Sequence, residues 1–72
     1  MNVYIAVVAD RHTDTAYTVF ADATAAIDYA RRAFRETVAH PGEIREQTVE
    51  GYEYYARYIE EDYACVVKRM VR

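Results

Sequence analysis

The residues of this chain that could do chemistry are few, and tyrosine is the most prominent of them. Eight of the 72 residues are tyrosines, and five of these lie between positions 52 and 63. A phenol ring offers rigid contact area with one polar end, and such side chains are enriched at protein interfaces. A small two-layer domain has too little interior to bury them all. We therefore expect some tyrosines to form an exposed binding surface.

A second group, Asp10, His12 and Asp14, places carboxylate and imidazole side chains at alternate positions. Both are ligands of divalent metal ions. A calcium-binding loop would need glycine at Thr15 and an acidic residue at Ala21, and neither is present. Polar residues of this kind are common at hairpin tips. The sequence therefore predicts a solvated loop and no metal site.

Nucleophilic chemistry has little support in the sequence. Cys65 is the only cysteine, so no disulfide can form within the chain. The two histidines, His12 and His40, fall in predicted loops, and no group that would lower the pKa of the thiol is evident. We expect Cys65 to be a small buried apolar residue.

Other motifs for catalysis or nucleotide binding are missing from the sequence. There is no serine nucleophile, and the two glycines, Gly42 and Gly51, do not form a phosphate-binding loop. The adjacent acids Glu60, Glu61 and Asp62 are expected to point in different directions into water from a turn. We therefore predict that the protein is not an enzyme and uses no cofactor or metal.

The composition is that of a small globular domain. The chain is 53% hydrophobic and 29% charged with a net charge of −3, which predicts a folded protein of one domain, residues 1–72. Its longest apolar run, residues 3–9, is far shorter than the ~20 residues of a membrane-spanning helix, and no secretory leader opens it. We expect a cytoplasmic protein with no membrane segment. Because so small a core gives modest stability, we also expect a homodimer.

Two extended segments and one helix account for the first half of the chain. β-branched and aromatic residues at 3–9 predict a strand buried on both faces, and residues 15–20 again favour extended structure. Asp22 is a suitable N-cap, because its carboxylate can accept a hydrogen bond from the first turn. An apolar period of about 3.6 then predicts a helix to about residue 39, lying on a sheet. Pro41 and Gly42 favour its end there.

Residues 52–71 fit two alternative structures. With a period of 2, Tyr52, Tyr54, Ala56 and Tyr58 share one face of a strand, and a second strand starts at Tyr63 after an acidic turn. With a period of 3.6, a different set of residues forms the apolar stripe of a long helix, namely Tyr52, Tyr55, Ala56, Ile59, Tyr63, Val66, Val67 and Met70. The density of Tyr and Val favours the hairpin. It gives an α+β fold, ββαββ, with a four-stranded antiparallel sheet and one helix on one face. The alternative is ββαα, with a C-terminal helix at 52–71.

The order of these segments resembles small uncharacterised ββαββ proteins of phages and actinobacteria. The resemblance rests on the opening VYIAVV at residues 3–8, the helix start at residues 25–31, the aromatic strand at 54–58 and the closing strand at 65–68. Where the turn of those proteins carries glycine, this chain has Glu61. The resemblance implies the ββαββ fold and, for a protein of phage origin, inhibition of a host protein.

These features predict a non-enzymatic module that binds or regulates another protein. In a ββαββ fold the helix covers one face of the sheet and leaves the other face open for a tyrosine-rich interface. The residues expected to bind the partner are Tyr52, Tyr54, Tyr58 and Tyr63.

Binding of single-stranded nucleic acid is the alternative function. Tyrosines would stack on bases, and Arg31, Arg32 and Arg35 would contact phosphates. These arginines lie on the predicted helix, on the side of the sheet away from the tyrosines. Because the chain is also acidic overall, nucleic acid is the less favoured partner.

Overall fold

The computed structural model describes residues 1–11, 14–59 and 62–71 of the chain. Along the sequence lie β1 (Asn2–Ala9), β2 (Ala16–Phe20), α1 (Ala23–Thr37), the short 3₁₀ helix η1 (Pro41–Glu43), β3 (Arg45–Gln47), β4 (Tyr54–Arg57) and β5 (Tyr63–Met70).

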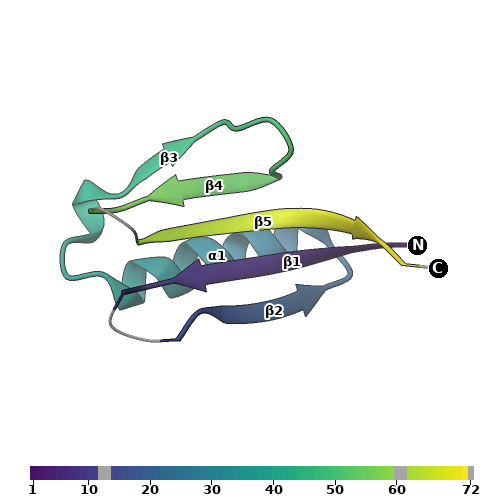
Figure 1. The fold of residues 1–72 in the computed structure, drawn as a ribbon, viewed down its shortest axis with the longest axis horizontal. Helices are drawn as coiled ribbons and strands as arrows, with labels where there is room; N and C mark the ends of the chain where they lie inside the picture. Colours follow the sequence, from purple (N-terminus) through teal and green to yellow (C-terminus); the bar gives the residue numbers. More distant parts are fainter. Residues whose placement is uncertain (12–13, 60–61, 72) are drawn as a thin grey trace.

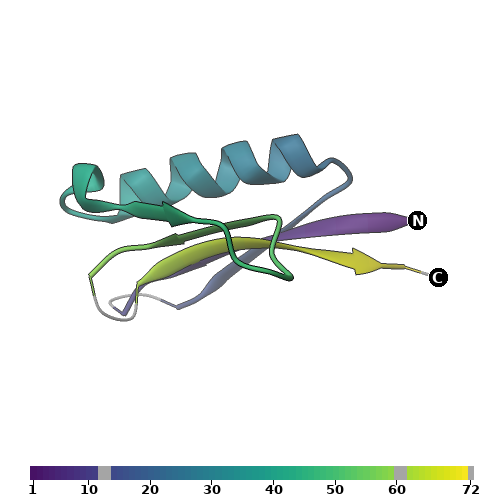
Figure 2. The ribbon, with the colours of Figure 1, turned by 90° about the horizontal axis from the view of Figure 1, so that it is seen from above.

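The five strands form one antiparallel sheet in the order β2-β1-β5-β4-β3. Figures 1 and 2 show α1 lying along one face of this sheet, while none of the helices in the described residues lies on the other face. The central pair, β1 and β5, brings residues 2–9 against residues 63–70. At the end of this pair the backbone N–H of Val71 donates a hydrogen bond to the carbonyl of Met1, at 2.8 Å.

The α+β class with one helix and the hairpin within residues 52–71 are confirmed, and the alternative C-terminal helix is wrong. The prediction of four strands is also wrong, because β3 adds a fifth strand and the order is ββαβββ. β3 is three residues long, and all of its side chains are exposed. A short polar strand of this kind has no alternation of apolar and polar residues, so hydrophobic periodicity in the sequence does not predict it.

A tight turn at Gly51 joins β3 to β4. The N–H of Tyr52 donates a hydrogen bond to the carbonyl of Val49, at 3.1 Å, which closes the turn. Gly51 has φ = +91°, in the left-handed region that favours glycine in such turns. The position of this glycine is the one local signal in the sequence for a hairpin that begins before residue 52.

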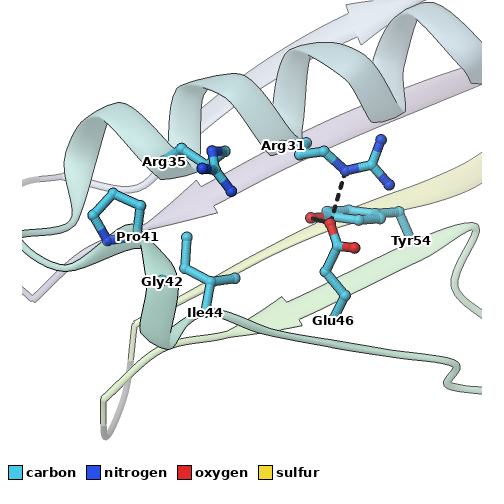
Figure 3. Close-up of a pocket in the computed structure, with 7 residues that line it drawn as sticks. All are labelled: Arg31, Arg35, Pro41, Gly42, Ile44, Glu46 and Tyr54. Atoms are coloured by element: carbon cyan, nitrogen blue, oxygen red, sulfur yellow. Dashed lines mark hydrogen bonds and ion pairs between the residues drawn. The ribbon is translucent and has the colours of Figure 1, made fainter.

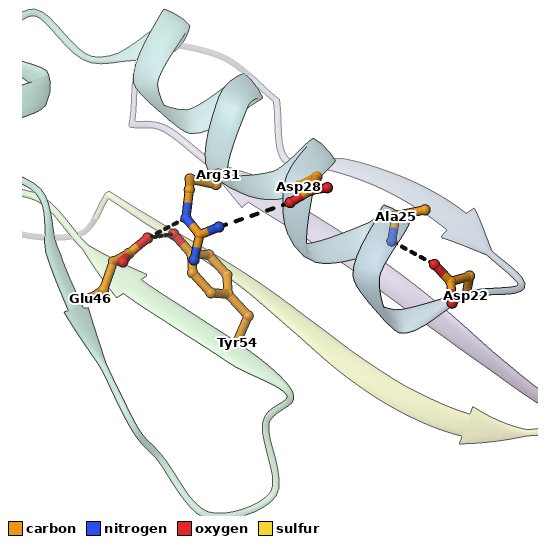
Figure 4. A network of polar contacts seen from close by, with 6 residues as sticks. All are labelled: Asp22, Ala25, Asp28, Arg31, Glu46 and Tyr54. Carbon is orange, nitrogen blue, oxygen red and sulfur yellow. Dashed lines mark hydrogen bonds and ion pairs between the residues drawn. The ribbon is translucent and has the colours of Figure 1, made fainter.

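The predicted start of the helix at Asp22 is confirmed. The Asp22 carboxylate accepts a hydrogen bond from the backbone N–H of Ala25 at 2.9 Å, as Figure 4 shows. This contact satisfies one of the N–H groups that have no partner within the helix. The helix ends at Thr37, two residues before the predicted end.

The contact between α1 and the sheet is made largely of alanine. Each of these alanines is at most 1% exposed, and the set comprises Ala26 and Ala30 of the helix and Ala6, Ala56 and Ala64 of the strands. Phe34 and Val66 are the largest fully buried side chains. Larger aromatic residues pack around this centre, and Phe20 and Tyr29 hold their ring centroids 5.3 Å apart at one flank.

Asp62 is buried rather than solvated, which corrects the expectation from the sequence. It is 4% exposed, and its Oδ1 accepts a hydrogen bond from the backbone N–H of Arg11 at 3.1 Å. A buried carboxylate needs such a donor, and here it connects the end of β1 to the start of β5. The other two acids of the predicted acidic turn, Glu60 and Glu61, lie outside the described residues.

The cap of α1 gives a test of the fold. Replacement of Asp22 by Ala should lower the free energy of unfolding by about 1 kcal/mol, because the Ala25 N–H then loses its acceptor. Urea unfolding monitored by circular dichroism measures this change. The matched Asp22→Asn variant keeps an acceptor oxygen and should lose less than half as much. Equal losses in both variants would show that the hydrogen bond is not what matters at this position.

Candidate functional site

The face of the sheet away from α1 carries a cluster of tyrosines. Tyr55 lies directly opposite Cys65, and Val7 lies opposite both Cys65 and Tyr17. Directly opposed residues of antiparallel strands project to the same face. We call this side of the sheet the open face. A hollow of about 350 Å³ on it is lined by Ile5, Val7, Tyr17, Tyr52, Tyr55, Tyr63, Cys65, Val67 and Arg69.

The tyrosine rings of the open face pack on one another. Tyr55 and Tyr63 are stacked, with centroids 6.1 Å apart and planes 8° from parallel, while Tyr52 meets Tyr55 edge to face at 5.2 Å. Tyr17 stands at the side of the hollow and is 69% exposed. Such ring pairs limit side-chain motion. The open face therefore presents a surface of tyrosine rings that are packed on one another.

Cys65 lies beneath these tyrosines and is 4% exposed, as the sequence predicted. Burial raises the pKa of its thiol, so the reactive thiolate is disfavoured. His40 lies before η1, where its backbone N–H donates a hydrogen bond to the hydroxyl of Tyr58, at 3.0 Å. His12 lies outside the described residues. Among the described residues, none of those that line the hollow with Cys65 is a histidine.

Arginines surround the tyrosine cluster. Arg57 lies opposite Tyr63 on one side and opposite Arg45 on the other, so all three residues share the open face. Arg69 lines the same hollow. The only acidic residue in the five strands is Glu46, which lies opposite the fully buried Ala56 and so faces the helix. The strands thus give the open face positive charge in a chain whose net charge is −3.

The four tyrosines predicted to bind a partner are divided between the two faces. Tyr52 and Tyr63 line the open face, but Tyr54 and Tyr58 pack on the helix-covered side, which corrects their expected placement. Tyr54 is only 9% exposed. A period of 2 groups Tyr54, Ala56 and Tyr58 on one face, and the fully buried Ala56 shows that this face is the covered one.

The open-face residues missed from the sequence are Tyr17, Tyr55, Arg45, Arg57 and Arg69. The alternation of side chains along a strand predicts the position of Tyr55, because Tyr55 must face away from its neighbour Tyr54. The arginines were overlooked because each stands alone in its strand. They come together only through the pairing of β3, β4 and β5.

Tyr54 takes part in a polar network on the covered side (Figure 4). Its hydroxyl and the Nε of Arg31 both donate to Oε2 of Glu46, each at 2.7 Å. The Arg31 guanidinium also lies 5.2 Å from the centre of the Tyr54 ring, and it pairs with Asp28 at 3.9 Å. The hydrogen bond from Arg31 lowers the pKa of Glu46, while burial and the Glu46 carboxylate raise the pKa of Tyr54. The network joins β3 and β4 to α1.

The three helix arginines considered for phosphate binding do not line one common site. Arg31 and Arg35 line a pocket of about 300 Å³ between α1 and β3, shown in Figure 3, and Glu46 occupies the same pocket. Arg32 lines a separate hollow of about 140 Å³ with Tyr29, Ala33 and Glu36. The carboxylates of Glu46 and Asp28 therefore neutralise the charge of Arg31, one of the three arginines that were expected to meet phosphates.

Within residues 1–11, 14–59 and 62–71, no group of three or more His, Cys, Asp or Glu side chains is placed to hold a metal ion. Of the loop residues considered as ligands, Asp10 and Asp14 are in this range. No helix in the described part of the chain is long and apolar enough to cross a membrane.

Comparisons with protein-family models, with curated proteins and with solved structures found no match to this chain. The resemblance to ββαββ proteins of phages and actinobacteria therefore stays a prediction.

The Glu46 network makes stability depend on pH. Because folding lowers the pKa of Glu46, its contribution is fully present above the usual value of 4.5 and is lost as the pH falls through the lowered folded value. Both side chains of the pair are nearly half exposed, so this contribution is about 0.2–1 kcal/mol. Urea unfolding of the wild type and of Glu46→Gln should differ by this amount near neutral pH and converge in acid.

Glu50→Gln, which removes an exposed acid from the β3–β4 turn, is the matched control for this measurement. It should unfold like the wild type near neutral pH. A difference between wild type and Glu46→Gln that stays constant down to low pH would contradict the role of the ionised carboxylate.

Proposed function

We propose that this chain is a non-enzymatic binding module whose open face docks on an acidic surface of another protein. The observation that carries the proposal is the composition of that face. Tyrosines occupy its centre, Arg45, Arg57 and Arg69 stand around them, and no strand position on this face is acidic.

The chemistry of these side chains suits such a partner. Tyr and Arg are the residues most often found at the energetic centre of protein interfaces. The stacked Tyr55 and Tyr63 rings would lose little conformational entropy on binding, because they are already held in place. Each guanidinium can bind a carboxylate with two parallel hydrogen bonds. An acidic partner would also be attracted over a distance by the local positive charge.

The same charge argues against a homodimer formed through this face. Two copies packed face to face would bring the arginines of one copy against those of the other, with no strand carboxylate between them. Juxtaposed like charges are costly at an interface. The open face therefore fits a different molecule better than a second copy of itself. A module of this kind acts by occupying its partner's surface, as the inhibitor implied by the phage resemblance would.

Selection from a random peptide display library tests the proposal with a defined probe. Selected peptides should be rich in Asp and Glu, and their chemical-shift effects should fall on Tyr55, Tyr63 and their strand neighbours. Tyr63→Ala should weaken binding about tenfold, as expected for one interface tyrosine. The double variant Arg57→Glu, Arg69→Glu should abolish binding by reversing the charge.

Arg32→Glu is the matched control, since it reverses an exposed charge on the helix side. Binding of the selected peptides should be retained in this variant. Selected peptides with no acidic bias, or an equal loss of binding in the helix variant, would overturn the proposal.

Single-stranded nucleic acid remains the second candidate function, because Arg57 lies beside Tyr63 on the same face. A groove with cations next to aromatic rings is how proteins bind single strands without sequence preference. It is second because Tyr55 and Tyr63 already stack on each other, which leaves less ring surface for bases. Salt-sensitive binding of an oligothymidylate to the open face, with no acidic peptide selected, would favour this function over the first.

A further inference from the structure

The edge strand β2 lacks the charged residues and proline that commonly protect an edge strand against pairing with another strand. β2 pairs with β1 only, and its other side is the edge of the sheet, at the bottom of Figure 1. No charged residue, proline or glycine occurs between Asp14 and Asp22. Tyr17 and Val19 of this strand are 69% and 62% exposed. An uncharged edge strand with exposed apolar side chains is a template for strand addition.

The opposite edge of the same sheet is built differently. β3 has only three residues, Arg45, Glu46 and Gln47, and two of them are charged. Short length and charge are the usual means by which proteins prevent edge pairing. The two edges of the sheet therefore differ, because β3 is short and charged while β2 is longer and uncharged.

A flank of the helix extends this edge on the covered side. Tyr29 of α1 contacts Phe20 of β2, and beside it a shallow hollow of about 140 Å³ is lined by Tyr29, Arg32, Ala33 and Glu36. The hollow holds apolar side chains together with one positive and one negative charge. A chain added at β2 would thus meet backbone groups at the sheet and a mixed surface at the helix.

We propose that β2 pairs antiparallel with β2 of a second copy of this chain, which joins the two sheets into one. The proposal goes beyond the proposed function and does not depend on what docks on the open face. In the pair, the two helices lie on the same side of the joined sheet, and the two open faces become one continuous surface that includes both copies of Tyr17.

A second copy fits this edge better than other occupants for three reasons. β2 is uncharged, so two copies meet without repulsion along the strand. Arg32 and Glu36 lie on one flank, so a two-fold axis can set Arg32 of each copy toward Glu36 of the other. Finally, because β3 is short and charged, the association stops at two copies and does not continue into a fibre.

Sedimentation of the purified protein over a range of concentrations tests the proposal. The mass should rise from that of the 8.4 kDa monomer toward twice this value. Amide exchange of the wild type should slow in β2 as the concentration rises, while β3 stays unchanged. Val19→Lys, which places a charge on an exposed edge position, should abolish both effects.

The control Gln47→Lys adds the same charge at the other edge and should leave the dimer intact. If the measured mass stays that of the monomer at protein concentrations up to about 1 mM, the proposal is overturned, because a dimer with a dissociation constant below this concentration would be detected. A dimer that Val19→Lys does not disturb, or one in which β2 exchange is independent of concentration, also overturns the proposal. The Arg57→Glu, Arg69→Glu variant should lose the selected peptides and keep the dimer. Val19→Lys adds a positive charge opposite Ile5 on the open face, so it should bind the acidic peptides at least as well as the wild type and lose the dimer.

Discussion

The close contact of α1 with the sheet depends on alanine, and much of the structure follows from this. Ala26 and Ala30 of the helix share the core cluster with Ala6, Ala56 and Ala64 of the strands, and the largest fully buried side chains in it are Phe34 and Val66. Such a core has no volume for eight tyrosines. They are placed at the rim of the core, where each hydroxyl can find a partner, or on the face that one helix cannot cover.

The helix and four of the strands were predictable because each has a strong local signal. Asp22 marks the helix start, the apolar stripe gives its length, and segments rich in Val and Tyr mark β1, β2, β4 and β5. β3 was not predictable in this way. It is held by pairing with β4 and by the contact of Glu46 with Arg31, and a single sequence does not reveal such partners before the chain is folded.

The sequence predicted the aromatic character of the candidate site but only some of its residues. An excess of tyrosine indicated an exposed aromatic surface, and Tyr52 and Tyr63 lie on it. Tyr54 was expected on the open face because side-chain alternation divides a strand into two faces but does not show which face the helix covers. The fully buried Ala56 distinguishes them, since so small a residue suits the close contact with α1. The arginines of the open face could not be grouped from the sequence, because they are neighbours only across strands.

The pairing of β1 with β5 has a consequence for how the chain reaches this structure. The two central strands come from opposite ends of the described sequence, so their contact requires nearly the whole chain to close into a loop. The β1–β2 hairpin and the β3–β4–β5 meander need only short loops and can form early. We expect folding to be limited by the meeting of these two halves, and we expect folding to be slow for so short a chain.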